Sequence, residues 1–273
     1  MPQPSLDQLA TSIIAALSRA VAEGVRALPP RGAIDREIVD ARLDAGIPAL
    51  HGEPLLGGPG EAGAALLEGV RRVADALASL GEPVAGAAAA VADALGDRRA
   101  GVDLAALAAD ALAGDWESAR AVAARLDVDE DALVTVLDYA VRAPLRTAAA
   151  AIRPALERRA TARGHCPGCG APPILAELRG KDRVRVLRCA RCDTSWEFAR
   201  VACPACGERD HRKLTALHAD GEESFRRADC CESCHAYVKA IATLDPLGPD
   251  ALLEKDIESV GLDWVAVDRG YHR

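Results

Sequence analysis

The chain has 273 residues, half of them hydrophobic but only 3% aromatic, and carries a formal net charge of -8 at pH 7. This length allows one large domain or two of ordinary size, with a core built mainly from Ala, Leu and Val. The negative charge argues against a general polyanion binder. Charges interrupt every apolar stretch well before the roughly 18 residues of a membrane span, and no basic leader precedes an apolar run. We therefore expect a cytoplasmic protein without membrane insertion.

The first 160 residues follow helical periodicity. Residues 5–28 place apolar side chains at three- and four-residue intervals, and a Gly- and Pro-rich loop is expected over 48–63. Further helices are expected at 35–45, 66–80 and 83–96, after the caps Asp103 and Asp115, and at 129–142 and 145–160. Pro144 should kink or divide the last two helices, because proline lacks an amide donor. This predicts an all-α helical domain over residues 1–160 whose apolar stripes serve helix packing.

The sequence pattern changes after His165. The segments ILAEL, RGKD and RVRVLRC predict a hairpin, and SWEFARVAC predicts a third strand. KLTALHA, DGEE and SFRRADC repeat this plan, with AYVKAIATL as the last strand. We therefore expect two copies of one unit, over 161–202 and 203–244, and a helical tail over 245–273 formed by one helix. The expected fold class is α plus small β: an N-terminal all-α bundle, two tandem zinc-ribbon or rubredoxin-like units, and a C-terminal helix.

Eight of the nine cysteines form four Cys-x-x-Cys pairs. Such a turn directs two sulfur atoms at one point, and two turns joined by a hairpin make a tetrahedral four-thiolate site. Nineteen residues separate the first two pairs and twenty-four the last two, which suits metal sites. The expected metal ligands are Cys166, Cys169, Cys189 and Cys192 in the first site, and Cys203, Cys206, Cys231 and Cys234 in the second.

Two metal ions per chain are therefore expected, either zinc or iron, because a four-thiolate site also holds a single iron in rubredoxins. Pairing in sequence order is the simplest solution, and a cross-braced arrangement stays open. Each small unit has too little apolar surface to fold alone, so metal binding replaces a hydrophobic core; structural zinc contributes about 10–16 kcal/mol in zinc-finger peptides. Gly170 and Gly207 suit the tight knuckles, where a positive φ is often required.

The other candidate ligands are interpreted more simply. Cys230 does not keep the Cys-x-x-Cys spacing to Cys234 and is expected to be a buried strand residue, although a substitute ligand or a reactive thiol is an alternative. The histidines near the sites are expected at the surface or beside a thiolate, not as ligands: His165, His211, His218 and His235.

Two further classes of function fit the sequence less well. A nucleic-acid-binding zinc ribbon needs a basic surplus, but residues 160–240 hold fourteen Lys and Arg against eleven Asp and Glu, and two four-thiolate metal sites would lower this +3 to about -1. A thiol redox protein would use a single Cys-x-x-Cys at a helix start, not four pairs. The sequence has no P-loop, no G-x-S-x-G and no clustered His/Asp set, so we do not expect an enzyme or a catalytic residue.

The segments CPGCGAPP, LRCARCDTSWEFARVACPACG and CESCHAYVKAIATLD resemble the formate dehydrogenase accessory protein family, FdhE. The resemblance covers residues 140–273 well and extends to DIESVGLDWVAVDRGYHR. It implies a cytoplasmic, chaperone-like maturation factor that binds the molybdenum- or tungsten-containing catalytic subunit of formate dehydrogenase and is needed for its assembly. It also implies metal binding by the eight paired cysteines. Whether the factor modifies or only holds its client, and its oligomeric state, stay open.

The client-binding surface is expected to include the ribbon pair and the groove where it meets the helical bundle. Trp196, Phe198 and Tyr237 would be rare aromatic anchors there if they were exposed, since aromatic side chains often dominate interface energetics. Their burial under the hairpins is the alternative.

Overall fold

A computed structural model describes residues 6–28, 34–157, 163–218 and 225–273. The chain forms two compact units, one from Met1–Ile34 and Leu50–Ala151 and the other from Asp35–Ala49 and Ile152–Arg273. The expected DGEE turn at 220–223 lies outside the described residues. Within the described ranges no helix is both long and apolar enough to cross a membrane. The fold class expected from the sequence is confirmed.

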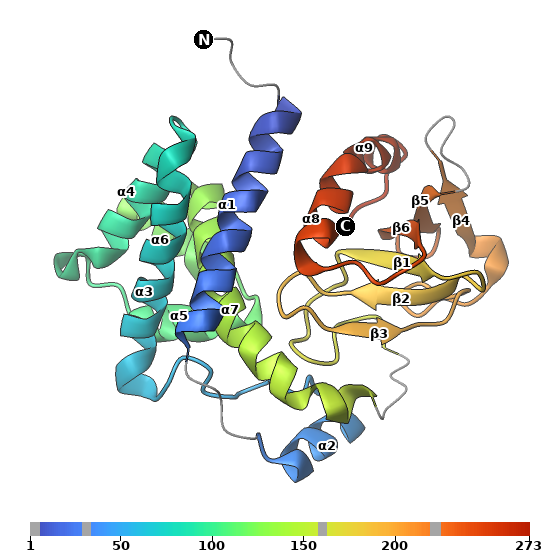
Figure 1. Cartoon of the computed structure of the whole chain (residues 1–273), viewed down its shortest axis with the longest axis horizontal. Coiled ribbons are helices and arrows are strands. Elements are labelled where there is room, and N and C mark those ends of the chain that lie inside the picture. The colour runs from blue at the N-terminus through green and yellow to red at the C-terminus, as the bar shows by residue number, and fades with distance from the viewer. Residues whose placement is uncertain (1–5, 29–33, 158–162, 219–224) are drawn as a thin grey trace. The chain divides into compact units, whose positions relative to one another are not determined.

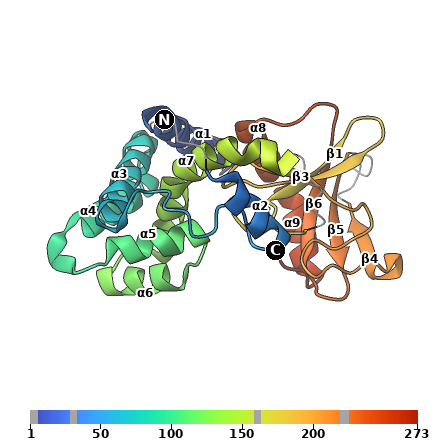
Figure 2. The ribbon, with the colours of Figure 1, turned by 90° about the horizontal axis from the view of Figure 1, so that it is seen from below.

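The first unit is helical. Its elements are α1 (Leu6–Ala27), α3 (Pro59–Leu77), η1 (Ala78–Leu80), α4 (Val84–Gly96), η2 (Arg98–Ala100), α5 (Leu104–Ala113), α6 (Glu117–Leu126) and most of α7 (Glu130–Glu157). Figure 2 shows α3 beside α4 and α5 beside α6. Asp103 caps α5 as expected, since its carboxylate accepts from the amides of Ala105 and Ala106. Asp115 likewise accepts from the amide of Glu117, in the first turn of α6.

Small residues allow close helix packing in this unit. A Cβ atom on Gly69 of α3 would lie only 2.9 Å from the carbonyl oxygen of Ala140 in α7. The same carbonyl lacks its usual helical donor, because the residue four positions later is Pro144. The expectation that Pro144 divides the helix is wrong: α7 continues through it to Glu157. Pro144 is buried, and tertiary packing on both sides of it outweighs the loss of one backbone hydrogen bond.

The second unit is built on one six-stranded sheet in the order β3-β2-β1-β6-β5-β4 (Figure 1). Its strands are β1 (Leu175–Arg179), β2 (Val184–Arg188), β3 (Ser195–Glu197), β4 (Leu214–Leu217), β5 (Arg226–Cys231) and β6 (Tyr237–Thr243), with a short η3 (His211–Lys213) before β4. β1 and β6 pair in parallel, with Ala176 opposite Ala240, while the other neighbours are antiparallel. The two expected hairpin units are therefore the two halves of one sheet.

The third expected strand is much shorter than its sequence pattern. Only Ser195–Glu197 pairs as β3, followed by one further bond from the Phe198 amide to the Arg185 carbonyl. The side chain of Arg185 is buried and donates to the carbonyls of Ala199 and Ala202, at 3.2 and 2.8 Å. These bonds satisfy the backbone of a segment that turns away from the sheet.

Two helices cover one face of the sheet, α8 (Pro249–Glu258) and α9 (Val260–Asp268). The expected C-terminal helical segment is confirmed, but as two helices and not as one. The break falls at Ser259, a buried residue whose hydroxyl donates to the carbonyls of Lys255 and Asp256, at 2.7 and 3.1 Å. A hydroxyl that donates hydrogen bonds to these carbonyls competes with the backbone amides that would continue the helix.

The segment Asp35–Ala49 is counted with this second unit and contains α2 (Arg36–Asp44). It contacts the chain around the first Cys-x-x-Cys pair. The amide of Ala49 donates to the carbonyl of Pro167 at 2.9 Å, and a guanidinium nitrogen of Arg163 donates to the carbonyl of Leu43 at 2.5 Å.

Glu177 of β1 is fully buried and carries a negative charge into the sheet. It accepts from two nitrogens of Arg179, at 2.9 and 3.0 Å, and from Arg188. The hydroxyl of Thr243 and the amide of Leu247 complete its shell, at 3.1 and 3.2 Å. Burial raises the pKa of Glu177, but the hydrogen bonds from Arg179 and Arg188 outweigh burial, and the pKa lies below its ordinary value.

Lys239 of β6 is the corresponding buried cation under the helices. Its ammonium lies 2.8 Å from a carboxylate oxygen of Asp256 in α8 and 2.7 Å from one of Asp263 in α9. Tyr237 donates its hydroxyl to Asp263 at 2.7 Å. A buried charge is stable only when paired and hydrogen-bonded, so this network fixes α8 and α9 on the sheet.

Candidate metal centres

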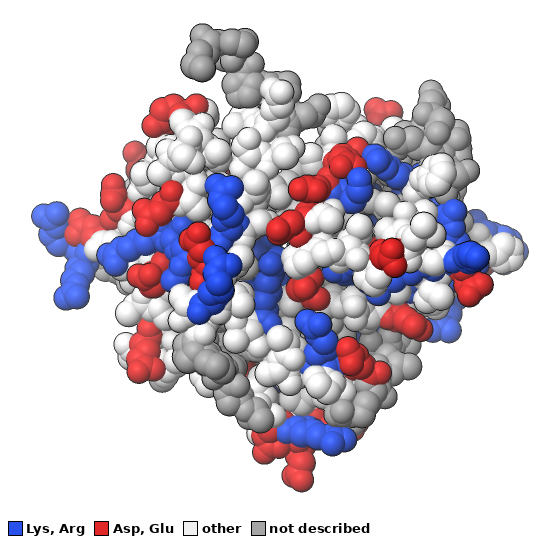
Figure 3. Space-filling model, viewed as in Figure 1, with Lys and Arg blue, Asp and Glu red and all other residues white. Residues whose placement is uncertain are grey.

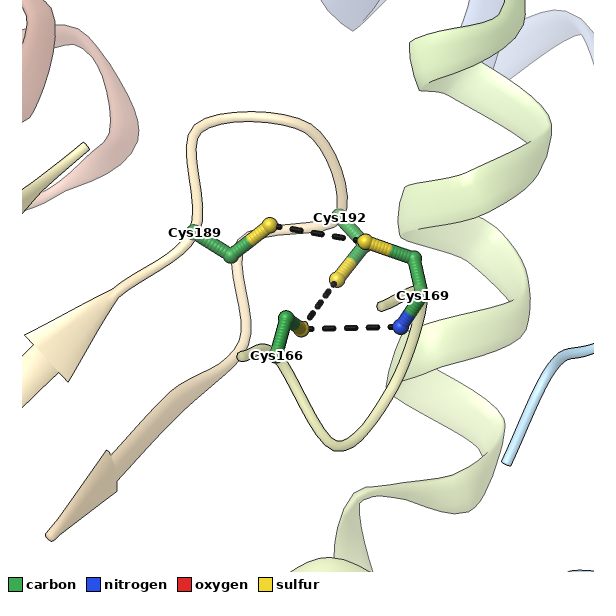
Figure 4. Close-up of side chains that lie close together, drawn as sticks. All are labelled: Cys166, Cys169, Cys189 and Cys192. Atoms are coloured by element: carbon green, nitrogen blue, oxygen red, sulfur yellow. Dashed lines mark hydrogen bonds between the residues drawn. The ribbon is translucent and has the colours of Figure 1, made fainter. Parts of the chain in front are cut away.

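The first four-cysteine cluster forms at one end of the β1–β2 hairpin. Cys166 and Cys169 come from the loop before β1, and Cys189 and Cys192 from the loop after β2, so antiparallel pairing brings the two loops together. Figure 4 shows the four side chains converging from these loops. The Sγ atoms of Cys166 and Cys192 are 3.4 Å apart, and those of Cys169 and Cys189 are 3.5 Å apart.

The second cluster forms in the same way around β4 and β5. It contains Cys203 and Cys206 before η3, Cys231 at the end of β5, and Cys234 between β5 and β6. The Sγ atoms of Cys203 and Cys234 are 3.7 Å apart, as are those of Cys206 and Cys231. The structure thus groups all eight cysteines in sequence order, without cross-bracing.

A shared backbone turn shapes each knuckle. In all four, the amide of the first cysteine donates to the carbonyl five residues later; the acceptors are Ala171, Thr194, Glu208 and Ala236. The residue just before each acceptor has a positive φ: 84° for Gly170, 61° for Asp193, 78° for Gly207 and 56° for His235. The expectation for the two glycines is confirmed. The matching roles of Asp193 and His235 were missed, although their position four residues after a first cysteine was a usable signal.

The two clusters differ in their access to solvent. In the first, Cys166, Cys189 and Cys192 are buried and Cys169 is half-buried, while in the second Cys206 is exposed. Within the first knuckle, a Cβ on Gly168 would lie 2.9 Å from Thr194 Oγ1 and 3.4 Å from Cys192 Sγ. The equivalent residue of the third knuckle is Ala205, which is exposed. The first cluster is therefore closed and the second is open on one side.

The sulfur atoms fit a tetrahedral metal ion. Within each cluster the four sulfurs lie within 4.8 Å of one another. A zinc–sulfur bond of about 2.3 Å places two sulfurs of a tetrahedral site about 3.8 Å apart, close to the separations of 3.4–3.7 Å found here. The two clusters could therefore hold two metal ions. Four thiolates and this geometry suit zinc and a single iron equally well.

The electrostatics of the first cluster favour a bound cation. Hydrogen bonds from the neighbouring thiols of Cys166, Cys169 and Cys192 lower the pKa of Cys189 well below its ordinary value. Burial raises the pKa of Cys166. Four closely spaced sulfurs, three of them on buried cysteines, can share few negative charges on their own, so a divalent ion would replace protons and allow the remaining thiols to ionise.

Cys230 belongs to neither cluster. It lies buried in β5, in an apolar cluster with Leu217 and Leu262, and its sulfur faces the carbonyl of Ala228 at 3.6 Å. Burial, followed by the charges of Asp229 and Glu232, raises its pKa to about 12. The expectation of a buried strand residue is confirmed. Among the described residues neither four-sulfur group includes a histidine.

The C-terminal residues support the fourth knuckle, a role that the sequence pattern did not reveal. The amide of His272 donates to the carbonyl of His235 at 2.8 Å, and the amide of Tyr237 donates to the carbonyl of His272 at 2.9 Å. The hydroxyl of Tyr271 donates to Glu232 at 2.5 Å. The backbone around Cys234 is therefore held from both sides.

The expected aromatic anchors are largely inside the unit. Trp196 is buried and donates its indole N–H to the carbonyl of Arg163 at 2.8 Å. Tyr237 is buried against α9, and Phe198 is half-buried. For Trp196 the alternative of burial is therefore confirmed, and for Tyr237 the interpretation as an exposed anchor is wrong.

The fold and the two four-cysteine clusters together define the class of the protein: a helical domain followed by tandem zinc-ribbon-like units. No protein-family model matches the chain. The chain is 34% identical over 112 residues to the FdhE homolog of Stutzerimonas stutzeri (strain A1501), and 35% identical over 114 residues to that of Pseudomonas aeruginosa (strain PAO1). Over this part of its sequence the chain is similar to FdhE homologs.

These alignments span 40% of this chain and only 35% and 37% of the two relatives, so the chain covers little more than a third of each relative's length. The fold is also similar to the crystal structure of the FdhE protein from Pseudomonas aeruginosa, with a TM-score of 0.67 and 24% identity. That comparison covers 100% of this chain and 95% of the other.

Proposed function

We propose that the chain is an accessory factor that binds the catalytic subunit of a formate dehydrogenase in the cytoplasm and is required for its assembly into active enzyme. The observation that carries this proposal is the pair of four-cysteine clusters on one continuous sheet, in a chain whose sequence is similar to FdhE homologs. The factor itself does not turn over formate.

The eight clustered cysteines are proposed to ligate one zinc or iron ion per cluster. Each cluster joins two loops at the end of a hairpin, so bound metal would fix the ends of both hairpins. In this interpretation the metal ions shape the surface that the client meets. In this proposal both ions have a structural role and take no part in a reaction.

A genetic experiment tests the requirement for this factor. Deleting the gene should abolish formate-dependent dye reduction in cell extracts, and the wild-type gene should restore it. The Cys169→Ser variant should fail to restore activity, because the first cluster loses a ligand. Cys230→Ser serves as the matched control and should restore it, since Cys230 lies outside both clusters.

A binding experiment tests the client directly. The purified chain should capture the formate dehydrogenase catalytic subunit and, on its own, should not reduce a viologen dye with formate. Full dehydrogenase activity in the deletion strain, together with no capture of the subunit, would refute the proposed function.

A further inference from the structure

α9 has apolar residues on both its inner and its outer side. On the inner side, Leu262 and Ala266 are buried in the cluster under the sheet. On the outer side, Val260, Trp264 and Val267 are 40%, 71% and 60% exposed. At 3.6 residues per turn these three side chains fall within about 60° of one another, so they form a single stripe. A contiguous apolar stripe on the outer side of a helix often marks a surface that a partner covers.

The stripe is held rigidly. Asp263 of the same helix is bound to Lys239 and Tyr237 of β6. After the helix, the amide of Gly270 donates to the carbonyl of Val267 and that of Tyr271 to the carbonyl of Ala266, at 2.9 and 3.0 Å. A surface fixed in this way loses little conformational entropy when a partner binds.

Acidic residues outnumber basic ones in α8 and α9, the two helices around the stripe. Residues 249–268 contain six Asp and Glu and one Lys. Of these acids, Asp250, Glu254, Glu258 and Asp268 are exposed, although Glu258 pairs with Arg226 and Lys255 and the exposed Arg269 follows α9. Figure 3 shows acidic side chains, with basic ones among them, over α8 and α9. A partner that covers the stripe should therefore have a basic rim.

The size of the stripe argues against a second copy of this chain as the partner. One Trp and two Val side chains offer on the order of 300 Å² of apolar surface, whereas each side of a stable interface buries about 800 Å². Two such stripes would make too small a dimer. A groove that receives the helix contacts its flanks as well, which is a common way to recognise a helical face.

We propose that Val260, Trp264 and Val267 dock into an apolar groove with a basic rim on the client protein, with Trp264 as the central anchor. This inference rests on the proposed function, since it places a docking surface for the same client. Trp is among the residues that contribute most to interface affinity.

The test measures the dissociation constant between the purified full chain and the formate dehydrogenase catalytic subunit. Trp264→Ser should weaken binding by at least about tenfold, and Val267→Ser by less. Two controls replace other exposed apolar residues of the same unit, one more and one less exposed than the tested pair: Leu244→Ser, at 82% exposure, and Ile38→Ser, at 44%. Both should leave the dissociation constant unchanged, and thermal unfolding should show that all four variants fold.

Charge gives an independent readout. Glu254→Lys and Asp268→Lys should each slow association, and the effect should shrink as salt screens the charges. Unchanged association of both variants at low salt would contradict a basic rim.

Each outcome separates the two proposals. If the wild-type chain does not bind the subunit, the proposed function fails. If the wild-type chain binds and Trp264→Ser binds equally well, the docking surface is wrong while the proposed function stands. If the wild-type chain is a dimer that Trp264→Ser converts to a monomer, a second copy covers the stripe and the inference is overturned.

Discussion

His235 occupies in the fourth knuckle the position that Gly170 occupies in the first. Both follow the first cysteine of their pair by four residues and both have a positive φ, 56° and 84° respectively. Glycine adopts this conformation without strain, whereas a residue with a Cβ pays about 1–2 kcal/mol. The fourth knuckle therefore tolerates a conformational strain that the first avoids.

Replacing these residues should have unequal effects on stability. Gly170→Ala introduces the left-handed strain and places a Cβ 2.9 Å from Pro48 Cγ, so it should lower the free energy of unfolding by at least about 1–2 kcal/mol. His235→Gly relieves strain but increases the entropy of the unfolded chain, so stability should stay within about 1 kcal/mol of wild type. Urea unfolding of the metal-loaded variants measures both, and equal losses would contradict the shared geometry.

Metal content should separate clustered from unclustered cysteines. Protein produced with defined zinc and iron should contain two metal ions per chain, and Cys192→Ser should contain one. Cys230→Ser should keep two, because this substitution alters only strand packing, at a cost of about 1 kcal/mol. Elemental analysis with thiol titration provides the measurement. Loss of metal from Cys230→Ser but not from Cys231→Ser would show that the last pair has been assigned wrongly.

The two proposed metal ions should leave at different rates. Cys206 is exposed, while three of the four cysteines in the first cluster are buried, so a chelator reaches the second ion first. A chromogenic chelator should record a fast and a slow phase of equal amplitude. Cys206→Ser should remove the fast phase, and the matched variant Cys192→Ser the slow one. A single phase in the wild-type chain would contradict this difference in access.

The ionisation of Glu177 should make the free energy of unfolding depend on pH. Because its pKa in the folded protein is lowered from an ordinary value of 4.5, its stabilising contribution is fully present above about pH 4.5 and declines as the pH falls toward the folded pKa. Glu177→Gln removes one of the two charged partners of the buried Arg188, leaving Asp193, and should cost up to about 3–5 kcal/mol at pH 7. The difference in unfolding free energy between wild type and variant should narrow below pH 4.5. A difference independent of pH down to pH 3.5 would show that the charge of Glu177 is unimportant.

The cysteine clusters could be predicted from the sequence because their geometry is local. A Cys-x-x-Cys turn and a hairpin of moderate length bring four sulfurs together without reference to the rest of the chain. The helices α1 and α4 could likewise be predicted, from the periodicity of their apolar residues and from the helix-breaking residues that follow them. In these cases every determinant lies within one short segment.

The features that escaped prediction depend on distant partners. The parallel pairing of β1 with β6 is set by neither strand alone. Glu177 and Lys239 look like ordinary polar strand residues, and only the arginines and acids brought from elsewhere allow their burial. The exposure of Trp264 could not be predicted for a different reason. An apolar residue in a helix is expected to be buried, and the sequence of α9 does not indicate which of its two apolar sides faces the sheet.

The parallel pairing between β1 and β6 also determines when the sheet can be completed during synthesis. β1 is the first strand to leave the ribosome and β6 the last, so β1 presents an open edge while the intervening chain is made. Closing that edge requires contacts between residues far apart in sequence, which form slowly. A ribosome that pauses before β6 would leave a folded first hairpin with an unpaired strand, ready to associate with the same strand of another nascent chain.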